Sequence, residues 1–276
     1  MSNRVLVTGA TGFVGRQVMK YLSLRDTRLT VVVRKGKQDL LFCQKNIEKI
    51  IQTDDLFAET EDWWADELTG IDTVIHLAWY AEPGSYLQSI KNIDCLKGTL
   101  AMSSAAKNAG VRRFIGAGTC FEYDLSAGYL SVDTLLKPLT PYAASKAAAY
   151  YMLSQFFSTQ AIEFAWCRLF YLYGEGEDSR RLVPYLRRKL GAGEVAELTS
   201  GNQIRDFIDV SEAGKEIAEV ALGNVCGPIN VCSGIPVTVR DLAESIADEY
   251  QRRDLLKFGT RPDNLFDPPC VVGIRN

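Results

Sequence analysis

A tyrosine and a lysine four residues apart are the side chains of this chain best suited to acid–base chemistry. Tyr142 and Lys146 follow Thr140-Pro141, which suits a helix start because threonine caps well and proline fits the first helical position. Side chains four positions apart lie on one helix face. An ammonium group and a helix N-terminus both favour the phenolate, so we expect the pKa of Tyr142 to lie below its usual value of about 10. The pair predicts a phenol that exchanges protons at neutral pH.

A hydroxyl residue at the end of a predicted strand extends this set. Thr119 directly follows the apolar segment 113–118. A hydroxyl at that position can hydrogen-bond a carbonyl or alkoxide oxygen held beside the tyrosine. The alternative role of Thr119 is to cap the turn that follows the strand.

Glycines at every third position form a loop near the start of the chain. Gly9, Gly12 and Gly15 follow the short apolar segment 5–8, and an amphipathic stretch continues over residues 16–24. This arrangement predicts a dinucleotide whose pyrophosphate lies on a helix N-terminus. We expect Gly9 to permit the tight turn, Gly12 to let backbone approach phosphate, and Gly15 to let the helix pack on the strand. The other loop residues expected at the cofactor are Thr11, Phe13 and Val14.

Basic residues after the second predicted strand indicate which dinucleotide is bound. Residues 29–33 predict a buried parallel strand, and Arg34 and Lys35 follow it. NAD-binding folds usually carry Asp or Glu at this position. A guanidinium instead binds the extra phosphate of NADP through paired, charge-assisted hydrogen bonds. We therefore predict NADP(H), with NAD(H) as the alternative cofactor if this is an ordinary solvated basic loop.

Composition excludes several classes of function. The net charge is −3 with no block of like charge, so neither nucleic acid nor a membrane surface is an expected partner. The chain opens directly into the first predicted strand, and we expect no signal peptide and a cytoplasmic location. Seven scattered cysteines suggest reduced thiols.

The single histidine removes another group of mechanisms. His76 cannot by itself supply a histidine-based metal site or a Ser-His triad, and no metal ion is expected. Because it lies inside an apolar segment, we expect a core histidine that is hydrogen-bonded to backbone.

Strand-like and helix-like segments alternate through the first two thirds of the chain. Residues 74–78, 113–118 and 162–169 predict strands, and residues 86–109 predict a long helix ended by Gly110. Such alternation predicts an α/β fold with a doubly wound parallel (Rossmann) sheet and ligand sites at the carboxyl ends of the strands.

The alternation of strand-like and helix-like segments ends after residue 172. We predict a dinucleotide-binding Rossmann domain with the catalytic residues over 1–172. A smaller, partly discontinuous substrate-binding lobe is predicted over 173–276, with a helix at 239–252 and segments able to return to the Rossmann sheet.

Taken together, these motifs resemble the extended short-chain dehydrogenase/reductase family. The glycine loop, Thr119, Tyr142 and Lys146, in that order and spacing, are similar to its NAD-dependent epimerase/dehydratase branch, which acts on nucleotide sugars. The resemblance runs over nearly the whole chain, including segments 72–78 and 205–210. It implies a nucleotide-sugar substrate, hydride exchange at the sugar ring and, frequently, a homodimer.

The resemblance also implies roles for individual residues. At the cofactor it implies an acidic residue near the adenine amine and a loop after the third predicted strand: Asp55, Leu56, Leu77, Ala78 and Trp79. At the substrate it implies the strand-end segment and two later residues: Thr119, Cys120, Phe121, Tyr171 and Arg205. Core packing is the alternative role of Phe121. A surface salt bridge with Asp206 or Asp209 is the alternative role of Arg205.

Departures from the family pattern narrow the chemistry. Family dehydratases place Asp-Glu after the active-site threonine, whereas this chain has Cys120 and Phe121. Glu122 comes one residue too late and should point elsewhere. No histidine follows Lys146, which disfavours epimerases that need a Cys/His proton-carrier pair.

We therefore predict an NADPH-dependent reductase of a nucleotide-linked 4-keto-6-deoxyhexose. The main alternative is a nucleotide-sugar 4-epimerase that works by transient oxidation with tightly bound NAD. A non-catalytic NADP-binding regulator and an NADPH reductase of non-sugar ketones are further alternatives.

Overall fold

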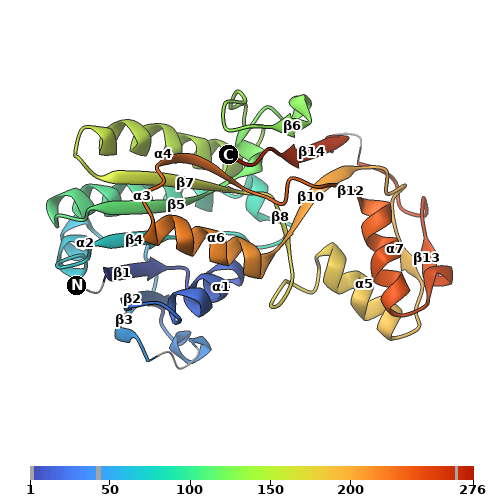
Figure 1. Ribbon diagram of the computed structural model, residues 1–276, viewed down its shortest axis with the longest axis horizontal. Helices are drawn as coiled ribbons and strands as arrows, with labels where there is room; N and C mark the ends of the chain where they lie inside the picture. The colour runs from blue at the N-terminus through green and yellow to red at the C-terminus, as the bar shows by residue number, and fades with distance from the viewer. Residues whose placement is uncertain (1–2, 42–44, 265–266) are drawn as a thin grey trace.

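Seven parallel strands form the central sheet, in the order β3-β2-β1-β4-β5-β7-β11 (Figure 1). This computed structural model describes residues 3–41, 45–264 and 267–276. The doubly wound Rossmann sheet is thereby confirmed. Its strands are β1 (Asn3–Thr8), β2 (Thr27–Arg34), β3 (Ile47–Thr53), β4 (Thr73–His76), β5 (Arg113–Thr119), β7 (Glu163–Leu169) and β11 (Gly227–Val231).

The observed strands lie where the apolar segments of the sequence predict them, and their ends differ from the prediction by one or two residues. The largest functional difference is at β4, which ends at His76 rather than at residue 78. Leu77 and Ala78 instead run past the glycine loop, where a Cβ atom on Gly9 would lie 2.7 Å from the Ala78 nitrogen. The two loops therefore approach each other at the carboxyl edge of the sheet.

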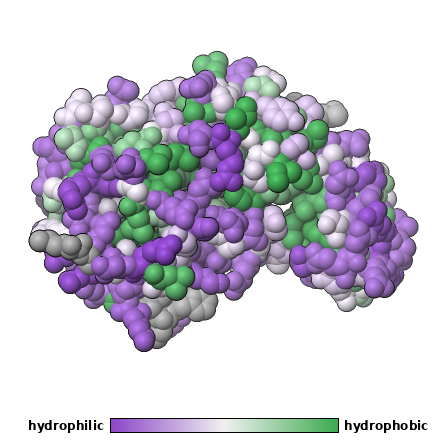
Figure 2. All heavy atoms as spheres, viewed as in Figure 1, coloured by the Kyte–Doolittle hydropathy of each residue, from purple (hydrophilic) through white to green (hydrophobic). Residues whose placement is uncertain are grey.

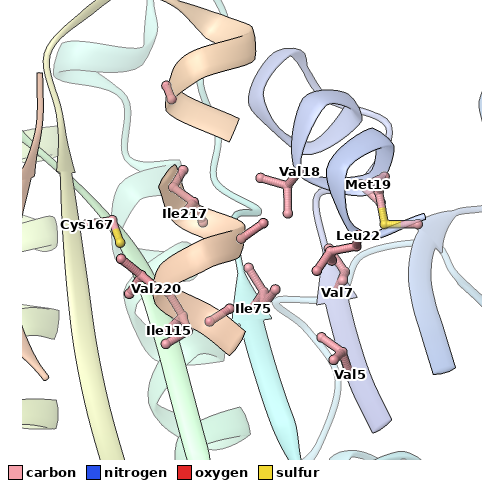
Figure 3. Close-up of a cluster of buried hydrophobic side chains, with 14 of the residues drawn as sticks. Val5, Val7, Val18, Met19, Leu22, Ile75, Ile115, Cys167, Ile217 and Val220 are labelled. Atoms are coloured by element: carbon pink, nitrogen blue, oxygen red, sulfur yellow. The ribbon is translucent and has the colours of Figure 1, made fainter. Parts of the chain in front are cut away.

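Helices cover both faces of this sheet. α1 (Phe13–Leu22) and α6 (Val210–Leu222) cover one face, and α2 (Glu61–Glu67), α3 (Lys91–Asn108) and α4 (Pro141–Ser158) cover the other. Figure 3 shows the first layer, where Val18 and Ile217 from the two helices point toward strand residues such as Val7. Removing such side chains from water stabilises the fold by about 1.5–3 kcal/mol each.

The long predicted helix over residues 86–109 begins later than expected. Tyr86–Gln88 form a separate 3-10 turn, and α3 starts at Lys91. The side chain of Asn92 donates to the carbonyl oxygens of Tyr86 (2.7 Å) and Ser89 (2.9 Å). These carbonyl oxygens accept from the Asn92 side chain, so they do not need the backbone N–H partners that a helix would supply. The backbone can therefore depart from helical geometry there. Two other predicted helices correspond to α1, which starts at Phe13, and to α7 (Val239–Glu249).

A small lobe projects from the main body (Figure 1). It consists of α5 (Leu182–Gly191), α7 and the parallel pair β9 (Ala196–Glu197) and β13 (Leu256–Lys257), which share an apolar core of their own. We call this the C-terminal lobe. The surface is indented between it and the main body (Figure 2).

In the described part of the chain, five short strands form a second, smaller sheet. They are β6 (Tyr129–Leu130), β8 (Tyr171–Tyr173), β10 (Ile204–Asp209), β12 (Pro236–Thr238) and β14 (Cys270–Gly273). After β10 the chain returns to the main body, where α6 packs on α1 and β11 pairs with β7. Segments from both halves of the chain therefore build the central sheet.

Candidate active site

The glycine loop fits a dinucleotide pyrophosphate. Gly9 has φ +74°, and its carbonyl oxygen accepts from the Gly12 nitrogen at 3.0 Å. A Cβ atom on Gly15 would lie 2.1 Å from the Gly9 oxygen, so only glycine lets α1 pack this closely. Gly12, the exposed N-cap of α1, provides no side chain for the free N–H groups of the first turn. Such a helix start binds anions. Thr11, Phe13 and Val14 line the same turn.

The basic residues after β2 differ in their surroundings. Lys35 Nζ lies 2.6 Å from Asp54 Oδ2, so its charge is already paired. Arg34 is exposed at the end of β2 and makes no ion pair with any residue that the structure describes. Asp55 and Leu56 follow the neighbouring strand β3. Within the described part of the chain, Arg34 is thus an unpaired cation at this edge of the sheet, next to the strand that carries the glycine loop.

Thr119, Tyr142 and Lys146 meet at the carboxyl end of β5. Thr119 is the last residue of β5, and its Oγ1 accepts from the Phe121 nitrogen at 3.3 Å. The Thr119 hydroxyl lies near the Tyr142 phenol, where it opposes the effect of burial on the pKa of Tyr142. The Lys146 Nζ donates to the Ala117 carbonyl oxygen at 2.6 Å. Thr119 therefore combines the two roles expected of it, as a cap and as a hydroxyl beside the tyrosine.

The expected lowering of the Tyr142 pKa is wrong. Burial raises the pKa of Tyr142, and the neighbouring Tyr86 adds to the effect. The Lys146 ammonium is held elsewhere, on Ala117 and over the ring of Trp79. Burial also lowers the pKa of Lys146 to about 7. In this structure the phenol is protonated at neutral pH.

The residues after Thr119 point in different directions. Burial raises the pKa of Cys120, so that it remains a neutral thiol. The Glu122 carboxylate is fully buried and accepts from the Thr119 nitrogen (2.8 Å) and from Arg168 Nε (2.7 Å). Trp166 Nε1 donates to the same carboxylate at 3.0 Å. Glu122 points away from the substrate side, as expected, but strand alternation is not the reason, because Cys120–Glu122 form a 3-10 turn in which Glu122 caps back onto Thr119. The buried carboxylate is not placed for acid–base work on a substrate.

An aromatic and cationic group lies beside Cys120. The rings of Phe121 and Tyr171 are 6.1 Å apart, and the Arg205 guanidinium lies 5.3 Å from the Tyr171 ring centre. Arg205 is only 3% exposed, and its Nη2 lies 2.6 Å from Asp267 Oδ2.

Neither Asp206 nor Asp209 pairs with Arg205, contrary to the alternative expected from the sequence. Asp206 is buried and accepts backbone N–H groups of Ser233, Gly234 and Gly273. Asp209 caps α6 instead. Both carboxylates are therefore committed to the fold.

His76 is a core residue, as expected, but its partners are hydroxyl groups rather than backbone. Its Nδ1 lies 2.8 Å from Thr8 Oγ1 and its Nε2 lies 2.9 Å from Thr99 Oγ1. Burial, with a contribution from Lys146, lowers its pKa to about 3. The imidazole is neutral and structural.

Sequence reasoning missed two residues of this site. Tyr86 lies edge-on against Tyr142, although the sequence predicts it only as the first residue of a long helix. The guanidinium of Arg181, in the segment that leads to α5, lies 5.9 Å from the centre of the Tyr86 ring. No sequence signal links these positions, because the contact joins two loops.

Two kinds of structural feature, a metal-binding cluster and a membrane-spanning helix, are absent from the part of the chain that the structure describes. The described ranges contain no cluster of three or more His, Cys, Asp or Glu side chains that could hold a metal ion. In the described ranges, none of the helices combines the length and the hydrophobicity of a bilayer-spanning segment. The six described cysteines are free, and Cys43 lies outside the described residues.

Comparison with known families and proteins gives the context of this site. Residues 5–227 match the model of the NAD dependent epimerase/dehydratase family. The chain belongs to this family. Its glycine loop and its Thr119, Tyr142 and Lys146 all lie within the matched range. The resemblance stated from the sequence is thereby confirmed.

Curated family members cover this chain almost completely. The dTDP-6-deoxy-L-talose 4-dehydrogenase (NAD(+)) of Aggregatibacter actinomycetemcomitans is 24% identical over 98% of this chain and 99% of its own length. The GDP-6-deoxy-D-mannose reductase of Pseudomonas aeruginosa is 28% identical over 91% of this chain and 81% of its own.

Solved family members share the fold. The UDP-N-acetylglucosamine 4-epimerase of Methanobrevibacter ruminantium M1, in complex with UDP-N-acetylmuramic acid, has a TM-score of 0.84 at 25% identity, over 100% of this chain and 90% of that one. MoeE5, in complex with UDP-glucose and NAD, has a TM-score of 0.82 at 25% identity, over 98% and 89%. The chain is thus similar to oxidoreductase-type enzymes that modify nucleotide sugars.

Proposed function

We propose that this chain is an NADPH-dependent reductase of a nucleotide-linked 4-keto-6-deoxyhexose. The observation that carries the proposal is the gathering of Thr119, Tyr142 and Lys146 at the carboxyl end of β5, with a phosphate-binding loop on the same edge of the sheet. Retention of all three side chains favours an enzyme over a non-catalytic NADP-binding regulator.

Two relatives support the substrate class. One is named a dTDP-6-deoxy-L-talose 4-dehydrogenase and the other a GDP-6-deoxy-D-mannose reductase. Both names thus refer to a nucleotide-linked 6-deoxyhexose. A 4-dehydrogenase run in reverse is a 4-ketoreductase. The two names differ in the nucleotide, which is dTDP in one and GDP in the other, so they leave the nucleotide of this chain's substrate open.

The protonation state of the site suits reduction. A bound reduced nicotinamide would supply a hydride to the keto carbon. The protonated Tyr142 then gives its proton to the alkoxide oxygen that forms, and the Thr119 hydroxyl holds that oxygen. Lys146 favours the resulting phenolate through its charge when protonated. A phenol that is already neutral before turnover is the form that a proton donor needs.

The cluster of Phe121, Tyr171 and Arg205 is the proposed substrate contact. Aromatic rings pack on the apolar faces of sugars, and a guanidinium pairs with phosphate. Because Arg205 is paired with Asp267, we propose that a substrate phosphate exchanges places with this carboxylate.

The cofactor preference yields a direct test at Arg34. Replacing this exposed cation by a carboxylate (Arg34→Asp) removes the phosphate contact and adds repulsion. We expect the KM for NADPH to rise by about 10- to 100-fold, as for a lost charge-assisted hydrogen bond, while the KM for NADH changes little. Lys35→Gln is the matched control, because Lys35 is already paired with Asp54. Equal weakening of both cofactors by Arg34→Asp would refute the assignment.

The second candidate is a nucleotide-sugar 4-epimerase with tightly bound NAD. The structural similarity to a UDP-N-acetylglucosamine 4-epimerase favours it, and transient oxidation requires the same three side chains. The protein as purified distinguishes the two. An epimerase interconverts saturated nucleotide sugars without added cofactor, whereas the proposed reductase consumes NADPH with a keto sugar.

We also propose that the chain is a homodimer. Helices α3 and α4 lie side by side on one face and expose the large apolar side chains of Ile93, Tyr151 and Met152. Apolar side chains exposed on two neighbouring helices are suited to association with a second copy of the chain. Sedimentation equilibrium should give twice the mass of 30.7 kDa, and Met152→Glu should shift the protein toward the monomer. A monomeric wild type at micromolar concentration would refute the proposal.

A further inference from the structure

One loop carries two aromatic rings onto both members of the tyrosine–lysine pair. The loop spans residues 77–90, between β4 and α3. Lys146 Nζ lies 3.8 Å from the centre of the Trp79 ring. The ring of Tyr86 meets that of Tyr142 edge-on, with centres 4.9 Å apart and an interplanar angle of 85°. Trp79 and Tyr86 thus contact the two side chains that the proposed reaction uses.

A buried amide at the start of α3 holds this loop. Asn92 is fully buried, and its Oδ1 accepts from Trp79 Nε1 at 2.9 Å. Its Nδ2 donates to the carbonyl oxygens of Tyr86 and Ser89. The oxygen and both amide hydrogens are therefore used, which fixes the orientation of the side chain. One residue sets the positions of both rings.

The Lys146 side chain needs such support because it is buried. Among the described residues its only hydrogen-bond acceptor is the Ala117 carbonyl oxygen, at 2.6 Å. The indole face of Trp79 attracts the ammonium electrostatically, most strongly where water is excluded. A long lysine side chain also loses rotamer freedom when it is held in one place. Without Trp79, both the charge and the position of Lys146 are less well defined.

We propose that Trp79 and Tyr86, held by Asn92, are positioning residues that fix the side chains of Lys146 and Tyr142 for proton transfer. The inference rests on the proposed function only in assigning the pair to the reaction. It assigns the two rings a role in organising the pair, beyond the expected contact of Trp79 with the cofactor.

The geometry can be tested without any substrate. The protein is labelled with ¹³C at the lysine ε-carbons. A proton above the face of an indole ring is shielded, so the ε-methylene signal of Lys146 should lie upfield of the signals of the other lysines. Lys146→Met should remove that signal and so assign it. Trp79→Leu should move it downfield, toward the position of exposed lysines, with the remaining shielding due to the Trp166 ring, whose centre lies 5.8 Å from Lys146 Nζ. A Lys146 signal that does not move in Trp79→Leu would overturn the inference.

The role can be tested by a conservative rescue. We expect Trp79→Leu to lower kcat by about tenfold, the size of a buried cation–π contact, with an unchanged KM for the keto sugar. Trp79→Phe keeps an aromatic face over Lys146 and should recover most of that loss. Trp63→Leu, a matched tryptophan change in α2, should leave kcat as in the wild type.

The outcomes separate this inference from the proposed function. Full kcat in Trp79→Leu, or no recovery in Trp79→Phe, would overturn the positioning role. A wild type that reduces no keto sugar but shows the shielded Lys146 signal would refute the proposed reaction while supporting the aromatic contact.

Discussion

Tyr142→Phe should lower kcat by about 10²- to 10⁴-fold, the usual contribution of a positioned general acid. The variant loses one hydroxyl beside the Thr119 side chain, while the ring that packs against Tyr86 remains. The affinity for NADPH should therefore change little. The measurement is single-turnover oxidation of NADPH with saturating keto sugar, together with NADPH binding by fluorescence.

A second tyrosine on the same helix provides the control for this variant. Tyr151 is exposed on α4, and Tyr151→Phe removes the same atom away from the site. Its kcat should equal that of the wild type. If Tyr142→Phe retained turnover within about tenfold of the wild type, Tyr142 would not be the proton donor.

Glu122→Leu should lower the free energy of unfolding by about 3–5 kcal/mol, the usual cost of breaking a buried ion pair by removing one partner. The exposed fractions of Glu122 and Arg168 are 0% and 1%. Their charges cannot be rehydrated in the folded state. The change also leaves Trp166 Nε1 and the Thr119 nitrogen without their acceptor. Urea unfolding at pH 7 measures the loss.

Replacing both charged partners by apolar side chains should recover the part of this loss that comes from the unpaired Arg168 charge, but not the part that comes from the unpaired Trp166 Nε1 and Thr119 nitrogen. In Glu122→Leu/Arg168→Met neither charge remains, and replacing a buried pair by apolar side chains is often close to neutral. Asp54→Asn, which breaks the exposed pair with Lys35, should cost less than about 1 kcal/mol. A loss in Glu122→Leu no larger than in Asp54→Asn would show that the buried pair does not stabilise the fold.

The framework of the site could be predicted because its signals are local. β-branched runs specify the strands, and the spacing of Gly9, Gly12 and Gly15 specifies the loop between β1 and α1. Thr140 and Pro141 likewise specify the start of α4, which places Tyr142 in its first turn. Each signal depends on residues close in sequence, so one chain suffices to read it.

The electrostatics of the site could not be predicted, because they depend on contacts between distant segments. The Tyr142 pKa is raised by burial, which the sequence does not report. The position of Lys146 over Trp79 and the pairing of Arg205 with Asp267 join different elements. The helix expected from residue 86 was interrupted by a side-chain bond of Asn92. In each case tertiary contacts override the local pattern.

The measurement that tests the central claim most directly follows the absorbance of the reduced nicotinamide at neutral pH. Purified protein is given NADPH, and then NADH, with a panel of 4-keto-6-deoxyhexoses linked to dTDP, GDP, CDP or UDP. We predict consumption of NADPH in preference to NADH with one member of the panel, and loss of that consumption in Tyr142→Phe. Interconversion of saturated nucleotide sugars without added cofactor, and no NADPH consumption with any keto sugar, would contradict the account and assign the chain as an epimerase.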